Sequence, residues 1–443
     1  MVTHWRRKAL SIGVSVAVLA IPLWVHAAQA SAQPAADRDA SLCAGPHWVR
    51  GWNSAPTDSL SLLDPTLTPN LSVARQTYRT VVSPRVRGSQ VRVHLTNEFR
   101  ADPLQIESVT LGEQSTGAAL TSPPTALTFG GSQQVTIPPF EEIVSDPIPL
   151  DTTAFAPLAI TTYVPGSTTF LTGHWNGNAP TYYTPPGSGD HSQDIRSDAF
   201  TLSTSNDLIV SGVDVLAPAG TSAVVAFGDS ITDGFVAGSI ASVPLSHTSI
   251  DDRVRYPSQL QRRVNDANLP LAVVNSGQSS SKLLQHGYLP PLGRSGLSRI
   301  EDDIINVDGV RDAIILQGIN DLGLPPWANA TQLITGFTEV INRLHAKGIR
   351  VHLGTILPAS NAIPNGTFAA PFSNTDRLTV NNWIRRDSPA DTIIDFDAAL
   401  RDPTNPNVLN PKYAGIDNLH PSPAGYIAMA NTIDLSTLGV QSC

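Results

Sequence analysis

Five short apolar runs recur along the second half of this chain, and they constrain its fold more than any other feature. The first run, 223–227, is continuously apolar rather than alternating, which is typical of a parallel strand buried on both faces. Helical patterns separate the runs, and such alternation predicts a parallel α/β sheet with flanking helices. The predicted strands are 223–227, 271–274, 313–316, 349–353 and 392–394, and the predicted helices are 256–268, 330–346, 375–386 and one starting near Pro423.

The first half of the chain has a different pattern. From His47 to about Pro218, short alternating runs such as 90–95 and 158–164 are separated by Pro, Gly and Ser turns. Repeated short strands at this spacing predict an all-β sandwich of the jelly-roll kind. We therefore expect a β-sandwich domain over 47–218 and an α/β domain over 222–443. The turn-forming linker between them is short, so we expect the two domains to pack together.

Four short motifs follow one another along the predicted α/β domain. They are Gly228-Asp229-Ser230, Gly277, Gly318-Ile319-Asn320-Asp321 and Asp417-Asn418-Leu419-His420. Ser230 follows the first predicted strand, Gly277 the second and Asn320 the third. Ligands bind beyond the carboxyl ends of the strands in an open parallel sheet. We therefore expect these three residues to lie at one edge of the sheet.

Ser230 and His420 are residue types that nucleophilic catalysis requires. Serine is a poor nucleophile unless a neighbouring base takes its proton, and Asp417 stands three residues before His420, where it can orient the imidazole. The G-x-S-x-G elbow of ordinary α/β hydrolases is absent from the sequence. Taken singly, Ser230 is also a good helix N-cap, and His420 a surface histidine before a proline turn.

The order and spacing of the four motifs resemble the SGNH/GDSL hydrolase family, from about residue 223 to the C-terminus. This resemblance implies a flavodoxin-like sheet, with Ser230 as nucleophile, His420 as general base and Asp417 as the residue that orients the base. It also implies an oxyanion hole made of the Ser230 and Gly277 backbone N–H groups and the Asn320 side-chain amide.

Several residues in these motifs have structural interpretations as well. Gly277 could be an ordinary turn glycine after its strand, and Asn320 a capping or turn residue. We interpret Asp229 and Asp233 as hydrogen-bond acceptors that organise loops. Asp321 is expected to be structural rather than catalytic.

Further blocks are similar to one branch of this family. Residues 255–257, 355–358 and 420–426 look like a bacterial and fungal branch with an N-terminal β domain, some members of which accompany xylan-degrading enzymes. The resemblance implies a serine esterase, EC class 3.1.1, and we expect short acyl esters, acetyl above all, on a plant or microbial polysaccharide. A broad-specificity lipase or acyltransferase of the same fold is the alternative. A third interpretation, an inactive carbohydrate-binding protein, is disfavoured by the intact motif residues.

The β domain contains two aromatic pairs, 174–175 and 182–183. They could stack on sugar rings, although packing in a core or turn is the commoner role of such side chains.

Residues 1–30 have the pattern of a secretory signal peptide. A basic stretch at 6–8 precedes an apolar run at 9–25, and Ala28-Gln29-Ala30 is a small-x-small cleavage site. The apolar run is short for a membrane anchor, so we expect export to the periplasm or medium, followed by a linker segment over 31–46. The formal charge of −9 gives no footprint for nucleic acid or anionic membranes.

The chain has only two cysteines, Cys43 and Cys443. In an exported protein we expect them to form a disulfide, with two unpaired thiols as the alternative. The histidines are scattered and the acidic loops lack ligand spacing, so we expect no metal and no cofactor. The sequence leaves the acyl chain length, the alcohol half of the ester and the oligomeric state open.

Overall fold

A computed structural model of the chain describes residues 42–58, 73–168, 171–177, 179–242, 254–286 and 294–439. The expected signal peptide and Cys443 lie outside these residues. Cys43 lies within them and is not a free thiol, but its pairing with Cys443 stays a prediction. Among the described residues, no helix is long and apolar enough to cross a membrane. Residues 33–443 form one compact unit.

The first half of the chain, which we call the β half, is built from antiparallel strands. Its strands are β1 (His47–Asn53), β2 (Thr57–Asp58), β3 (Val73–Val82), β4 (Gly88–Thr96), β5 (Leu104–Ile106), β6 (Ser108–Glu113), β7 (Thr125–Ala126), β8 (Val135–Ile137), β9 (Glu142–Val144), β10 (Ile148–Thr152), β11 (Leu158–Thr168), β12 (Thr172–His174), β13 (Thr181–Tyr183), β14 (Leu202–Thr204), β15 (Asp207–Leu208) and β16 (Val210–Ala217). Two sheets are the largest, with the orders β1-β16-β4-β10 and β14-β13-β3-β11-β6-β7. Strand β9 also pairs with β4, and β15-β12-β2 form a smaller sheet.

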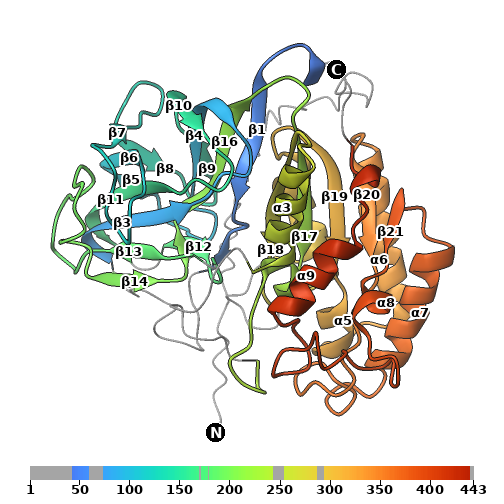
Figure 1. The fold of residues 1–443 in the computed structure, drawn as a ribbon. Helices are drawn as coiled ribbons and strands as arrows, with labels where there is room; N and C mark the ends of the chain where they lie inside the picture. The colour runs from blue at the N-terminus through green and yellow to red at the C-terminus, as the bar shows by residue number, and fades with distance from the viewer. Residues whose placement is uncertain are drawn as a thin grey trace, which may run out of the picture. The chain divides into compact units, whose positions relative to one another are not determined.

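The second half, the α/β half, contains a parallel sheet with flanking helices (Figure 1). Its strands are β17 (Ser222–Gly228), β18 (Leu271–Gly277), β19 (Val310–Leu316), β20 (Arg350–Gly354) and β21 (Thr392–Ile394). Its helices are α2 (Ser230–Asp233), α3 (Tyr256–Asp266), α4 (Gly296–Ile300), the π-helical η2 (Glu301–Ile305), α5 (Ile319–Gly323), α6 (Ala330–His345), α7 (Ser373–Arg386), α8 (Phe396–Leu400), α9 (Pro423–Thr432) and the short 3-10 helix η3 (Leu435–Thr437). The strand order β18-β17-β19-β20-β21 is the flavodoxin-like order, in which the chain reverses direction across the sheet beside the first strand.

Burial explains why the apolar runs became strands of this sheet. All seven residues of β17 are buried, and β17 pairs in parallel with β18 on one side and β19 on the other. Two of the four long helices begin at a side-chain cap: α6 follows Asn329, whose side chain accepts from the backbone N–H of Gln332, and α9 follows Ser422, whose side chain accepts from the backbone N–H of Gly425. The predicted fold class, an antiparallel β-rich region followed by a flavodoxin-like α/β sheet, is confirmed. The short helices α2, α4, α5 and α8 were not predicted, because four or five residues are too few to show a helical period.

The β half and the α/β half share one hydrophobic core, since buried side chains of both belong to a single cluster. Polar contacts also join them. The Asn53 side chain of β1 donates to Ser276 Oγ of β18 over 2.9 Å. The backbone N–H of Arg50 donates to the carbonyl of Asp308 over 2.9 Å. The carboxyl-terminal end of β18 is therefore in direct contact with the β half.

Candidate active site

The carboxyl ends of three neighbouring strands place the predicted site residues. Ser230 follows the end of β17, Gly277 is the last residue of β18, and Asn320 lies four residues after the end of β19. These strands are adjacent and parallel, so their carboxyl ends meet at one edge of the sheet. The sequence-based expectation that the three residues share one edge agrees with this arrangement.

Ser230 is the first residue of the short helix α2, directly after a tight turn. The turn needs glycine at position 228, because a Cβ there would come within 2.0 Å of Thr232 Oγ1 and 2.6 Å of the Leu316 carbonyl. Asp229, not Ser230, is the N-cap: its side chain accepts from the backbone N–H of Ile231 over 3.0 Å. Burial raises the pKa of Asp229 to about 7. Ser230 is thus held at a helix start with its hydroxyl free of the capping role.

His420 lies beside Ser230 although 190 residues separate them in sequence. Its Nε2 is 2.7 Å from Ser230 Oγ, and its Nδ1 is 2.6 Å from Asp417 Oδ2. A carboxylate only accepts hydrogen bonds, so Nδ1 carries the proton and Nε2 is left to accept from the serine hydroxyl. The structure therefore brings Ser230, His420 and Asp417 into one hydrogen-bonded chain.

The Asp417 carboxylate is fixed by its own short loop. Its Oδ1 accepts from the backbone N–H groups of Leu419 and His420, and its Oδ2 also accepts from Ser242 Oγ over 2.9 Å. The intervening Asn418 has a φ of 57°, a left-handed conformation that asparagine tolerates well. Burial opposes ionisation of Asp417, but the hydrogen bonds and charge interaction with His420 outweigh it and lower the pKa of Asp417 to about 2. Asp417 is therefore an anion at any ordinary pH.

Gly277 lies against the backbone of α2. A Cβ at this position would come within 2.2 Å of the Asp233 backbone nitrogen, so only glycine fits. The N–H of Gly277 donates to Asn275 Oδ1 over 2.8 Å. The Gly277 N–H, one of the predicted oxyanion donors, is therefore already hydrogen-bonded to the Asn275 side chain.

Asn320 is oriented by two hydrogen bonds that the sequence did not reveal. Its Nδ2 donates to the Ser281 carbonyl over 3.0 Å, and its Oδ1 accepts from Asn365 Nδ2 over 2.9 Å. The Asn320 amide nitrogen carries two N–H groups, and the bond to Ser281 uses one of them. Asn365 lies in the segment between β20 and α7, with no motif around it that could have marked it.

Two buried side chains, Arg299 and Asp321, make hydrogen bonds to the backbone around the site. Arg299 donates to the carbonyls of Gly228 and Ser276, each over 2.8 Å, and so ties together the ends of β17 and β18. The Asp321 carboxylate accepts from the backbone N–H groups of Leu283 and Leu284. Asp321 therefore organises a loop, in agreement with the structural role expected for it.

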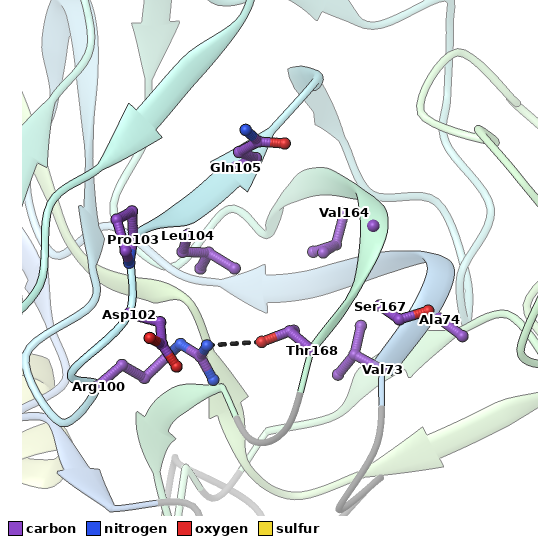
Figure 2. A pocket seen from close by; sticks show the side chains of 11 residues that line it. Val73, Ala74, Arg100, Asp102, Pro103, Leu104, Gln105, Val164, Ser167 and Thr168 are labelled. Atoms are coloured by element: carbon purple, nitrogen blue, oxygen red, sulfur yellow. Dashed lines mark hydrogen bonds between the residues drawn. The ribbon is translucent and has the colours of Figure 1, made fainter.

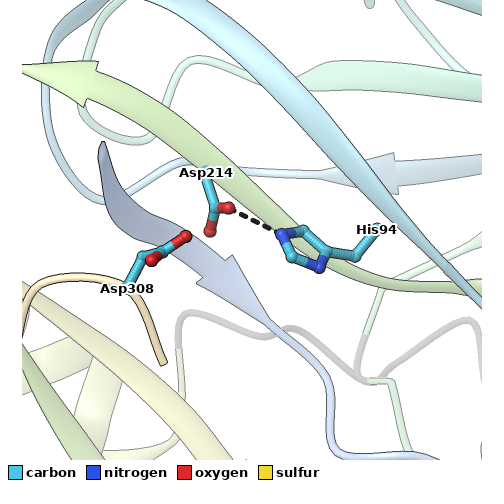
Figure 3. Close-up of side chains that lie close together, drawn as sticks. All are labelled: His94, Asp214 and Asp308. Carbon is cyan, nitrogen blue, oxygen red and sulfur yellow. Dashed lines mark hydrogen bonds and ion pairs between the residues drawn. The ribbon is translucent and has the colours of Figure 1, made fainter. Parts of the chain in front are cut away.

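His94, Asp214 and Asp308 form the acidic and histidine cluster that most resembles a metal site among the described residues (Figure 3). Arginines already occupy these carboxylates: Arg50 Nε lies 2.6 Å and Arg92 Nε 2.9 Å from Asp214, and Arg92 also pairs with Asp308. Guanidinium groups on the same oxygens disfavour a cation there. We interpret the cluster as an ion-pair network at the contact between the two halves.

The β half also contains a hollow of about 550 Å³ between β3, β5 and β11. Figure 2 shows two of its lining residues, Arg100 and Thr168, joined by a hydrogen bond that the Arg100 guanidinium donates. The predicted site residues are not among its lining residues. This hollow is therefore a separate feature of the β half.

One member of each aromatic pair of the β half is buried against another aromatic ring. Trp175 is buried against Phe235, with ring centroids 6.1 Å apart. Tyr183 is buried against Tyr78, with ring centroids 5.8 Å apart. Core packing, the commoner role for such residues, is therefore what the structure gives for Trp175 and Tyr183.

Hydrogen bonds link a buried serine, histidine and aspartate at the carboxyl edge of a flavodoxin-like sheet. This arrangement defines an α/β protein of the hydrolase class. Residues 226–428 match the model of the GDSL-like lipase/acylhydrolase family, and this part of the chain is a domain of that family. A comparison with curated proteins finds no match.

Solved structures similar to the chain include three esterases. The aryl esterase of M. smegmatis shares 14% identity over 48% of this chain and 95% of its own, with a TM-score of 0.37. A carbohydrate acetylesterase from Sinorhizobium meliloti shares 14% over 47% of this chain and 95% of its own, with a TM-score of 0.36. A family two carbohydrate esterase from Clostridium thermocellum, solved with cellohexaose, shares 14% over 87% of this chain and 96% of its own, also with a TM-score of 0.36. The family assignment rests on the match of residues 226–428.

Proposed function

We propose that this protein is a secreted serine esterase that removes short acyl groups, acetyl above all, from a polysaccharide. In this proposal Ser230 is the nucleophile, His420 the general base and Asp417 the residue that orients it. One observation carries the proposal: the continuous hydrogen bonds from Ser230 Oγ to His420 Nε2, 2.7 Å, and from His420 Nδ1 to Asp417 Oδ2, 2.6 Å. Membership of an acylhydrolase family supports it.

The proposed reaction proceeds through an acyl-enzyme. His420 Nε2 takes the Ser230 proton as Oγ bonds to the ester carbonyl carbon, and the imidazolium then returns that proton to the departing alcohol oxygen. Water, deprotonated by the same nitrogen, then bonds to the carbonyl carbon of the acyl-serine. The bond from that carbon to Ser230 Oγ breaks, the imidazolium returns the proton to Oγ, and the carboxylic acid leaves. Asp417 stays ionised throughout, because its pKa of about 2 leaves no proton on it.

The negative charge on the carbonyl oxygen requires preorganised donors. In the proposal these are the backbone N–H of Ser230, which begins α2 and so has no acceptor within the helix, and the second N–H of the Asn320 amide. Gly277 is the third proposed donor. To serve as an oxyanion donor, the Gly277 N–H must release its hydrogen bond to Asn275 Oδ1 and donate to the substrate oxygen instead.

The central test is the Ser230→Ala variant. We expect it to fold as the wild type does and to lose activity on nitrophenyl acetate by about four orders of magnitude, because no other group can form the acyl-enzyme. Circular dichroism and urea unfolding are the controls for folding. A folded variant with near-native turnover would remove the proposed mechanism.

The substrate is tested with nitrophenyl esters of graded chain length, together with acetylated xylan and pectin, scored for released acid. A short-chain polysaccharide esterase should release acetate from a polysaccharide and lose activity as the acyl chain lengthens. Preference for long chains, with no acetate released from either polysaccharide, would contradict the proposed substrate.

A broad-specificity lipase or acyltransferase is the second candidate, and one surface feature favours it. Phe368 and Phe372 are 94% and 77% exposed, and both lie in the segment that carries Asn365, next to Asn320. Exposed apolar side chains on the segment whose Asn365 holds Asn320 suit an apolar substrate. High activity on long-chain esters, or acyl transfer to an added alcohol, would decide for this candidate.

Export and domain limits belong to the same proposal. We propose that residues 1–30 are removed as a signal peptide, that 31–46 form a linker segment, and that the β-sandwich and hydrolase domains extend over 47–218 and 222–443. N-terminal sequencing of the protein recovered from the periplasm or medium should begin at Ser31. Recovery of the full-length chain from the cytoplasm alone would contradict export.

A further inference from the structure

Two neighbouring residues of the β half lie directly behind the proposed catalytic residues. His174 ends β12, and Trp175 follows it. Both side chains are buried, His174 with 4% and Trp175 with 6% of its surface exposed. Each contacts α2 or the segment that follows it, which belong to the α/β half.

His174 makes hydrogen bonds through both ring nitrogens. Nδ1 is 2.6 Å from the Ala55 carbonyl, and Nε2 is 3.0 Å from Asp233 Oδ1. Both partners are oxygen acceptors, so an imidazolium that donates from both nitrogens satisfies them together. Burial opposes this charge, but the nearby Asp233 and Asp207 outweigh it and raise the pKa of His174. The two acceptors and the raised pKa therefore favour the imidazolium form of His174, which pairs with Asp233.

Asp233 connects the two segments that carry proposed oxyanion donors. It is the last residue of α2, which begins at Ser230. Its second carboxylate oxygen accepts from Ser279 Oγ over 2.6 Å, and Ser279 lies two residues beyond Gly277. One carboxylate thus ties the end of the four-residue helix α2 to the segment that follows β18. His174 holds that carboxylate from the opposite side.

Trp175 acts on the other part of the site through Phe235. The Phe235 ring packs against the imidazole of His420, with centroids 4.5 Å apart, and Trp175 stacks on Phe235 at an interplanar angle of 26°. Trp175, Phe235 and Ala237 form a small apolar cluster separate from the main core. Trp175 therefore limits how far Phe235, and with it His420, can move.

We propose that His174 and Trp175 are positioning residues of the active site, so that the β half completes the catalytic centre rather than serving as a separate binding module. His174 acts through Asp233 on the oxyanion donors, and Trp175 acts through Phe235 on the general base. The proposal rests on the function proposed for Ser230 and His420. Its physical basis is that small displacements of catalytic groups cost much of the rate.

The test compares Trp175→Ala, Trp175→Phe and His174→Gln in the full-length protein. We expect Trp175→Ala and His174→Gln to lower kcat on nitrophenyl acetate by about tenfold or more with little change in KM, and Trp175→Phe to restore most of the loss. Tyr183→Ala is the matched control, because Tyr183 is a stacked, buried aromatic of the same half without contact to the site. It should lower stability but keep kcat.

A fluorophosphonate probe that labels an activated serine separates the possible outcomes. If wild-type Ser230 is not labelled, the proposed function fails and this inference fails with it. If the wild type is labelled and the His174 and Trp175 variants are labelled at the same rate, only the positioning roles are overturned. An equal loss of kcat in Tyr183→Ala would likewise overturn them, since general destabilisation would then explain the effect. Trp175→Phe and His174→Gln remove few atoms, so we expect both variants to fold. They test the positioning roles even if Trp175→Ala does not fold.

Discussion

At the scale of single residues, the site depends on side chains that hold other side chains. Asp417 holds His420 through Nδ1, and Asn365 holds Asn320 through its amide oxygen. An amide can rotate about its last side-chain bond, so a neighbour that accepts or donates at one end decides which way its N–H groups point. Asn365 donates to Asn320 Oδ1, so the Nδ2 of Asn320 points away from Asn365 and toward the Ser281 carbonyl.

We predict that Asn365→Ala lowers kcat on nitrophenyl acetate by about tenfold, because the Asn320 amide loses the partner that orients it. Asn320→Ala should cost more, on the order of a hundredfold, because the donor itself is removed. Steady-state kinetics of both variants give the comparison. Asn374→Ala is the control, since Asn374 pairs with Asn407 at the start of α7 and has no bond to Asn320. An Asn320→Ala enzyme with wild-type kcat would exclude Asn320 as an oxyanion donor.

At the scale of elements, the ends of β17 and β18 are packed so closely that glycine is required in both. A Cβ at Gly228 would clash with Thr232 and the Leu316 carbonyl, and a Cβ at Gly277 would clash with the backbone of Asp233. Arg299 then ties the two strand ends together through their carbonyls. The close backbone approach at the two glycines, together with the Arg299 side chain, therefore sets the distance between the proposed nucleophile and the neighbouring strand.

Gly277→Ala tests this close packing. The new Cβ would meet the Asp233 nitrogen at 2.2 Å, so α2 and β18 must separate, and we expect both stability and kcat to fall. Overpacking of this kind typically costs about 1–3 kcal/mol of unfolding free energy, which urea unfolding can measure. Gly166→Ala is the matched control, because a Cβ at Gly166 has no neighbour within 4 Å. Two variants of equal stability would show that the α2–β18 contact can relax freely.

At the scale of the whole molecule, several buried groups keep their protons in the folded state. Burial raises the pKa of Asp229 to about 7 and that of Asp207 to about 6. The pKa values of His174 and His94 are also raised, because nearby carboxylates outweigh the cost of burying their charge. His174 and His94 lie at or near the contact between the two halves, so the charge state of this contact depends on pH.

These shifts predict that stability falls as pH rises. Groups with folded pKa values above their unfolded values bind more protons when folded, so their contribution is full below the unfolded pKa and lost as pH rises through the folded pKa. The unfolding free energy from urea titration should therefore be lower at pH 9 than at pH 6. Asp229→Asn should reduce the difference, whereas Asp151→Asn, at an exposed position, should not. Stability that is constant or rising over this range would contradict the assignment of the shifts.

Chain order and local periodicity were enough to predict much of this protein. Apolar runs marked all five parallel strands, and three of these runs (223–227, 271–274 and 313–316) are continuously apolar, because a strand buried on both faces has no polar side. The predicted fold class is confirmed by the sheet orders. The four motifs also placed Ser230, Gly277 and Asn320 at one edge of the sheet and indicated the family that residues 226–428 match. Such signals are local, so they survive in a single sequence.

Only the tertiary structure decided which distant side chains support these residues. Asn365 reaches Asn320, Phe235 covers His420, and His174 pairs with Asp233 across the contact between the two halves. No periodicity or spacing encodes such pairs, because they depend on where the chain returns after tens of residues. The same holds for the Gly277 N–H, whose acceptor Asn275 was visible in the sequence but whose hydrogen bond was not. The sequence determined which chemistry the chain carries, and the packing of the two halves decided how that chemistry is held in place.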